Sequence, residues 1–217
     1  MTFKLPKLIA TSVVRGSVQG ESHGGIYTVD FEKKEAEQHV DWNTSNIDFE
    51  GRGADRGLRG ICFNEEDIYI AASDELFCYD KNFKNKGSIK NRYLKHAHEI
   101  CRMENRIFLT STGFDSLLSF NLEAKQFDWG FQLRKEYDQW TGGLFDPRKS
   151  IGPRPVNDFH INMIDVSEDG IFFSGLRTEG LFLLKADNTV AKVCELPSGT
   201  HNPQFWKDGI IFNDTVS

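Results

Sequence analysis

Four residues that suit ligand binding recur at a shared position in this 217-residue sequence. Arg59, His98, His160 and His201 each precede a short apolar segment, and they follow one another at intervals of 39, 62 and 41 residues. Neutral imidazole is a good ligand for Zn²⁺ and similar ions, and an open coordination position can hold a substrate. We therefore predict a divalent metal, zinc or similar, at the three histidines. Arg59 is expected to clamp a carboxylate or phosphate in bidentate fashion.

We call Arg59, His98, His160 and His201 the anchors. Polar residues near the anchors extend the predicted site. Glu99 and Asp158 are the candidate catalytic carboxylates, acting as general bases near the metal. An Asp before a strand more often satisfies turn amides, so a turn role is favoured for Asp158 and both roles stay open for Glu99. The predicted ligand-binding residues are Arg59, Asp115, Asn157, Arg177, Asn202 and Trp140.

The remaining histidines are expected to play no part in the site. His96 is predicted to point to the other side of the strand from His98 and to be structural, and His23 and His39 are expected at the surface. Each anchor histidine also has a simpler alternative, a hydrogen bond to the backbone of a neighbouring strand. The chain has no HExxH, GxSxG or P-loop pattern, so no motif supports a hydrolase or a nucleotide-binding protein.

The anchors must be positioned by a repeated unit of short strands. Residues 96–121 read as three strands, at 98–101, 107–112 and 117–120, separated by polar turns. The second strand begins nine residues after Arg59, His98 and His201, and eleven after His160. A period near 40 residues with about four strands is typical of a β-propeller blade. A sandwich of two sheets has no reason to repeat these offsets.

The sequence therefore predicts one all-β domain over residues 1–217, a β-propeller that is six-bladed in the intact protein. About four and a half blades are expected here, as an incomplete ring truncated at the C-terminus, because the last unit supplies only two strands. Residues 131–156 interrupt the repeat between blades. Their three prolines, paired glycines and Trp140 predict an ordered excursion that covers the site as a lid.

Composition limits the classes of partner. The net charge is −6 and the sequence pI is about 5.5, which argues against nucleic acid because phosphate binding needs a basic face. No apolar run reaches the 18 or more residues of a membrane span. The four cysteines fall inside predicted strands, which favours small buried side chains over disulfides. Unpaired cysteines in turn predict a cytoplasmic location.

Several segments resemble an uncharacterised family of bacterial propeller proteins, known only as a domain of unknown function. The segments are RGLRGICF at 56–63, YLKHAHEI at 93–100, LTSTGFDSLLSFNL at 109–122, NDFHINMI at 157–164 and SGTHNPQFWKDGIIFNDT at 198–215. The family is distantly similar to NHL-type and SMP-30/gluconolactonase-type propellers. The resemblance implies a six-bladed ring and implies no activity.

Two functions from different classes follow from these observations. The favoured one is a small-molecule-binding propeller with a histidine-lined site at the mouth of its central channel, with metal-dependent lyase or hydrolase activity as its enzymatic form. The alternative is a non-catalytic scaffold that binds a protein partner. Clustered channel histidines favour the first, and an exposed apolar rim favours the second.

Overall fold

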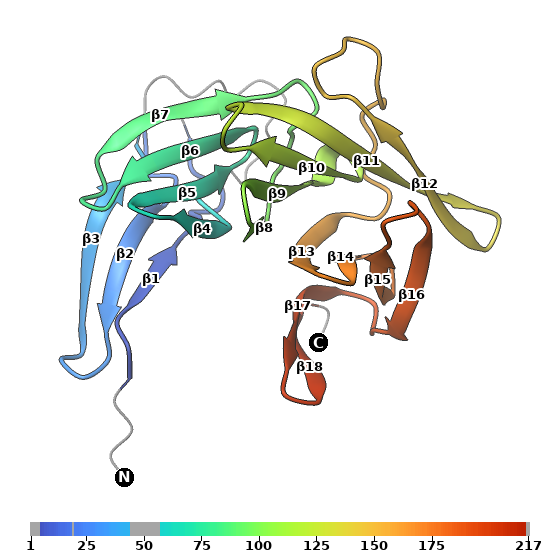
Figure 1. Cartoon of the computed structure of the whole chain (residues 1–217). Coiled ribbons are helices and arrows are strands. Elements are labelled where there is room, and N and C mark those ends of the chain that lie inside the picture. Colours follow the sequence, from blue (N-terminus) through green and yellow to red (C-terminus); the bar gives the residue numbers. More distant parts are fainter. Residues whose placement is uncertain (1–4, 19, 44–56, 216–217) are drawn as a thin grey trace.

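The computed structural model describes residues 5–18, 20–43 and 57–215. In this part of the chain, five antiparallel sheets are arranged in an arc around a common axis (Figure 1). Four sheets have three to five strands and form the blades, and a two-stranded sheet follows them. The all-β propeller predicted from the sequence is confirmed. The six-bladed count stays a prediction, since four blades are present.

The first two blades come from the N-terminal half of the chain. The strands of the first blade are β1 (Leu8–Thr11), β2 (Gly25–Asp30) and β3 (Glu35–Asp41). Those of the second are β4 (Ile61–Asn64), β5 (Asp67–Ala72), β6 (Glu75–Asp80) and β7 (Asn85–Lys90). Neighbours in sequence are neighbours in each sheet, so every blade is an antiparallel meander whose first strand lies nearest the axis.

The other sheets repeat this order. The third blade holds β8 (Ile100–Met103), β9 (Arg106–Ser111), β10 (Ser116–Asn121), β11 (Gln126–Glu136) and β12 (Gln139–Phe145). The fourth holds β13 (Ile161–Ser167), β14 (Gly170–Gly175), β15 (Gly180–Leu184) and β16 (Val190–Glu195). The last sheet is the hairpin of β17 (Thr200–Trp206) and β18 (Gly209–Asp214).

The core lies between successive blades, because each sheet presents an apolar face to the next. Phe131 of the third blade and Phe173 and Phe182 of the fourth are fully buried in one such interface. Leu76 and Leu118 are equally buried where the second and third blades meet. Burying side chains of this size contributes about 1.5–3 kcal/mol each, so the interfaces hold the blades in fixed relation.

Burial along the second strand of a sheet is similar in the second, third and fourth blades and much lower in the last hairpin. Ile70 and Leu109 are fully buried, whereas Phe108 and Phe172 are half-buried. In the last hairpin, Ile210 packs against the cluster that contains Met163 and Leu181, whereas Ile211 is 53% exposed.

Residues 131–156 do not form the predicted lid. Their first half continues β11 and forms β12, which adds a fifth strand to the outer side of the third blade. The second half packs back on the blade: the Tyr93 hydroxyl donates to the Lys149 carbonyl at 3.1 Å, and the Val156 N–H donates to the Gly113 carbonyl at 3.0 Å. No residue of this segment lines either cavity that contains the histidines.

The cysteines agree with the sequence prediction in part, since Cys101 and Cys194 are only half-buried. All four are free, Cys62 and Cys78 are buried, and burial raises the pKa of the Cys62 thiol to about 12. Among the helices of the described residues, none is long and apolar enough to cross a membrane.

Candidate functional site

The innermost strands bring the four anchors together at one end of the blades. Arg59 stands two residues before β4, His98 two residues before β8, His160 directly before β13, and His201 is the second residue of β17. These strands contact one another in the order β4, β8, β13 and β17. The repeat therefore places one anchor per successive sheet at the same level along the axis.

The three histidines form a group that could hold a metal ion. One ligand nitrogen from each lies within 4.8 Å of the others. The ring centroid of His98 is 5.1 Å from that of His160 and 5.7 Å from that of His201. In a triangle of this size one point lies within about 2.8 Å of every nitrogen, and Zn–N bonds of about 2.1 Å need only small side-chain rotations.

His98 is held in a defined tautomer. Its Nδ1 lies 2.8 Å from the His96 carbonyl, which can only accept, so Nδ1 carries the proton and Nε2 the lone pair. Nδ1 also lies 2.8 Å from Thr112 Oγ1, whose hydroxyl donates to the Ile161 carbonyl at 2.5 Å. In metal sites, hydrogen bonds to the ring nitrogen that does not bind the metal orient the histidine in this way.

His160 is oriented through its backbone. Its φ of 54° lies in the left-handed region, which costs a non-glycine residue free energy unless the surroundings fix it. Asp115 supplies that restraint, since its carboxylate accepts the N–H groups of Asp158, Phe159 and His160 at 2.6, 3.1 and 3.0 Å. The His160 Nδ1 is buried and has no hydrogen-bond partner in the described part of the chain, so it remains available to a ligand.

Burial keeps these histidines neutral. It lowers the pKa of His98 to about 2, with the positive charge of Arg59 as the next cause. Burial and Arg177 lower the pKa of His160 to about 4, and burial and Arg59 also lower that of His201. All three imidazoles therefore offer lone pairs at neutral pH without first releasing a proton.

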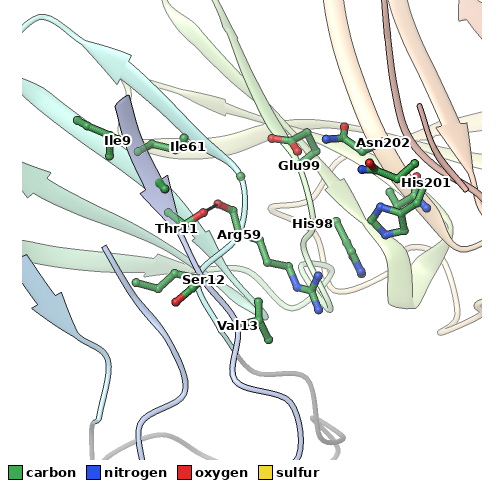
Figure 2. Close-up of a pocket in the computed structure, with 15 residues that line it drawn as sticks. Ile9, Thr11, Ser12, Val13, Arg59, Ile61, His98, Glu99, His201 and Asn202 are labelled. Carbon is green, nitrogen blue, oxygen red and sulfur yellow. Dashed lines mark hydrogen bonds between the residues drawn. The ribbon is translucent and has the colours of Figure 1, made fainter. Parts of the chain in front are cut away.

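Two cavities meet at the histidines. The larger, of about 480 Å³, is lined by segments of β1 and β4 and by polar side chains that include Arg59, His98, Glu99, Asn162, His201 and Asn202 (Figure 2). The smaller, of about 370 Å³, shares Arg59 and two of the histidines. Its other lining residues are Arg15, Ser73, His96, Asn157, His160, Leu176 and Thr215. Both sizes suit a small organic molecule.

Glu99 is the carboxylate of the larger cavity. Its side chain stands at the wall between Arg59 and Asn202 (Figure 2). Burial raises its pKa to about 7, against the lowering effects of the Ile100 N–H and of Arg59. A carboxyl group with a pKa near neutrality can both accept and release a proton.

Several residues predicted for the site do other work. Asp115 is fully buried and accepts three backbone N–H groups, so it holds the loop before β13, and it lines neither cavity. Arg177 Nη1 donates to the carbonyls of Asn157 and Asp158 at 2.8 and 3.2 Å and braces the same loop. Trp140 packs on Phe182, with ring centroids 4.8 Å apart, and outside the cavities.

Asp158 also lies outside both cavities, with its side chain exposed. Its N–H group donates to Asp115, which agrees with the turn role that the sequence favours. Asn157 and Asn202, by contrast, do line the cavities.

Two histidines lie where the sequence did not predict them. His96 lines the smaller cavity and lies in a bend before β8, with a φ of 55°, so the side-to-side alternation of a strand does not apply to it. His23 is fully buried, with its Nδ1 2.5 Å from Ser17 Oγ and its ring edge-on to Trp42. His39 is half-buried and stacks on Phe83.

Sequence reasoning also missed Arg15, Thr112 and Asn162. Arg15 opens the polar, glycine-rich segment after β1, and Asn162 follows His160 by two residues. Its position close to the anchor His160 could have indicated that Asn162 belongs to the site. Thr112 carried none, since its role depends on a contact with Ile161 across 49 residues.

Fold and site together define a β-propeller with a three-histidine group at the axis. No protein-family model matches the chain, and a comparison with curated proteins gives no match. The family suggested by the sequence and its distant similarity to NHL and SMP-30 propellers therefore stay predictions.

Solved structures resemble the chain in fold. One is a catalytically inactive variant of virginiamycin B lyase from Staphylococcus aureus with quinupristin, at 12% identity and a TM-score of 0.50, over 87% of this chain and 70% of that one. The selenomethionine-substituted form of the same lyase gives 14% identity and a TM-score of 0.49, over 87% and 69%. At 12% identity, the likeness to the first of these structures shows the propeller fold alone.

Proposed function

We propose that this propeller binds a divalent metal ion through His98, His160 and His201, and a small molecule in the adjoining cavities. The observation that carries the proposal is the approach of three neutral imidazole nitrogens to within 4.8 Å, each from a different sheet. The unpartnered Nδ1 of His160 fits a missing ligand, because buried polar atoms are rarely left unsatisfied. Zinc or a similar ion suits an all-nitrogen donor set.

The enzymatic form of this function is a metal-dependent lyase or hydrolase. When bound, the ion would supply Lewis-acid chemistry that polarises a substrate oxygen. Glu99 lies in the same cavity and would accept the proton that such a reaction releases, since its raised pKa leaves part of the population ionised at pH 7. Arg59 would orient a negatively charged substrate group on the side of β4.

Metal titration of the purified chain tests this proposal. We expect one Zn²⁺ per chain in competition with a chromophoric chelator. His201→Ala should lower the affinity by more than about 100-fold, because losing a ligand costs more than the roughly 10–100-fold lost with an outer partner of a ligand. His39→Ala is the matched control, because His39 lies on β3 and outside the cavities. Equal zinc affinity in wild type and His201→Ala, with unchanged circular dichroism, would sink the proposal.

The alternative is a scaffold that binds a protein partner without catalysis. The observation on its side is the apolar surface of the β17–β18 hairpin, where Phe205, Trp206 and Ile211 are 46%, 59% and 53% exposed. This function predicts no metal site in the titration. It also predicts that Trp206→Ser, and not His201→Ala, abolishes binding of the partner.

A further inference from the structure

We propose that the smaller cavity binds the oxyanion group of a small polar acid, a carboxylate or a phosphate, between Arg15 and Arg59 and next to the three histidines. This inference rests on the proposed function, in which a metal ion at the three histidines would contact the anion together with the arginines. The arginine pair and the polar groups described below are independent of the metal.

The charge of the cavity wall favours an anion. Arg15 and Arg59 contribute two guanidinium groups, and His96 stands with the three anchor histidines in the same wall. Among the described residues that line this cavity there is no carboxylate. A concave site walled by one sign of charge concentrates ligands of the opposite sign, and guanidinium groups match the geometry of carboxylate and phosphate oxygens.

Arg15 is brought to this wall by a folded loop. The Ser17 hydroxyl donates to the Val14 carbonyl at 3.0 Å and contacts the buried His23 at 2.5 Å. The His23 N–H in turn donates to the Trp42 carbonyl at 3.2 Å, which ties the loop to the first blade. The turn that presents Arg15 is therefore fixed by contacts behind it, although the Arg15 side chain itself is exposed.

Arg59 approaches from the second blade. Its carbonyl accepts from Thr11 Oγ1 at 2.5 Å and its N–H donates to the Ala71 carbonyl at 2.9 Å. The backbone is thus held while the side chain extends toward His98 (Figure 2). Arg15, Arg59 and His201 line the same cavity, so the two cations reach one histidine from segments 44 residues apart in the sequence.

Unsatisfied polar atoms continue from this wall into the larger cavity. Asn162 is 1% exposed, and both its amide oxygen and its amide nitrogen lack hydrogen-bond partners within the described residues. The side-chain oxygen of Asn202 is in the same condition. Both residues line the larger cavity, which His98, His201 and Arg59 also line. Buried amides without partners cost stability, so they indicate hydrogen bonds to a polar ligand body.

These features define the ligand class. The acid group would contact the arginines in the smaller cavity, and a hydroxyl- or carbonyl-bearing body would reach Asn162 and Asn202 in the larger one. A cavity of about 480 Å³ beside one of about 370 Å³ admits a molecule of metabolite size.

Calorimetric titration with two probes tests the proposal. Inorganic phosphate and succinate are each titrated into the whole chain, once loaded with Zn²⁺ and once stripped of metal and dialysed free of chelator. We expect a dissociation constant below 1 mM for at least one probe, weakened at least tenfold in Arg59→Gln and in Arg15→Gln. Arg92→Gln is the matched control, an exposed arginine outside both cavities. Arg59→Lys keeps the charge and is the second variant should Arg59→Gln fail to fold.

The outcomes separate this inference from the metal site. Zinc binding without binding of either probe would overturn the inference and leave the proposed metal function standing. Probe binding by a chain that takes up no zinc would support the anion cavity and overturn the metal function. Equal binding in Arg15→Gln, Arg59→Gln and Arg92→Gln would also overturn the inference. Preference for phosphate or for succinate then identifies the source of the oxyanion.

Discussion

The carboxylate of Asp115 accepts the backbone N–H of His160 at 3.0 Å, although the two residues are 45 positions apart and belong to different blades. The same carboxylate accepts two further N–H groups, those of Asp158 and Phe159. A side chain of the third blade thus fixes the loop that carries a candidate metal ligand of the fourth.

Asp115→Asn is expected to weaken both the fold and the metal site. Asparagine keeps one acceptor oxygen but turns its NH2 group toward at least one of the three backbone N–H groups, and leaving such a buried donor unsatisfied costs about 1–3 kcal/mol. Urea unfolding measures that loss, and zinc competition measures the accompanying fall in affinity. Asp187→Asn is the control, because Asp187 caps an exposed turn through Thr189, where changes stay within about 0.5 kcal/mol. Wild-type zinc affinity in Asp115→Asn would contradict a positioning role.

Thr112→Val tests the contact behind His98. Valine fills the same volume and removes the hydroxyl that lies 2.8 Å from His98 Nδ1. Losing an outer partner of a ligating histidine lowers metal affinity about 10–100-fold. Thr178→Val is the control, since Thr178 is equally buried and bonds only to the backbone of the fourth blade. Equal zinc affinity in the two variants would show that Thr112 is merely structural.

Acid should destabilise the metal-free chain in a histidine-dependent way. The pKa of His98 is 6.5 in the unfolded chain and about 2 in the folded one, so the unfolded state binds the extra proton. The contribution of His98 is therefore fully present above pH 6.5 and is lost as pH falls toward 2. Between pH 7 and 5 it should decline by about 2 kcal/mol, at about 1.4 kcal/mol per unit below 6.5.

The comparison with His98→Gln isolates this contribution. Urea unfolding of both chains at pH 5, 6 and 7 should give a flatter pH dependence for the variant. Glu99 contributes with the opposite sign, because its raised pKa stabilises the fold at low pH and loses that effect through about pH 7. It is present in both chains and cancels in the difference. Parallel pH curves would refute the buried, neutral state of His98.

Core substitutions should follow burial in the blade interfaces. Phe173→Ala removes a fully buried ring that stacks on Phe182 at 5.6 Å, and is expected to cost about 3–5 kcal/mol in urea unfolding. Phe108→Ala should cost less, because its ring is half-buried. Phe205→Ala, at a side chain that is 46% exposed, should cost less than either. A reversed order would invalidate the packing between the third and fourth blades.

Periodicity predicted the propeller and the meeting of His98, His160 and His201. A repeated offset from the inner strand gives equivalent residues the same height along the propeller axis and the same direction toward that axis. Departures from regular strand geometry were not predictable in this way. His96 and Asn202 adopt φ values of 55° and 50°, and nothing in their residue types demands the left-handed region. Residues at such positions leave the pleat, so alternation gives the wrong direction for His96.

Long-range contacts account for the other differences. Asp115 and Trp140 have side chains that suit ligand binding, yet Asp115 accepts three N–H groups 43 to 45 positions away and Trp140 packs on Phe182. Arg15 enters the site only because the first blade stands beside the second. Such pairings depend on how sheets pack, and the local spacing of residues does not encode them.

The three-sheet origin of the histidine group has a mechanical consequence. An ion held by His98, His160 and His201 would cross-link the chain, closing loops of 62 and 41 residues much as a pair of disulfides would. Closing loops of such lengths removes conformational entropy from the unfolded chain, by an amount that grows only slowly with loop length. The ion would then act as a reversible cross-link between three sheets. Separating the blades under force would require breaking its coordination bonds first.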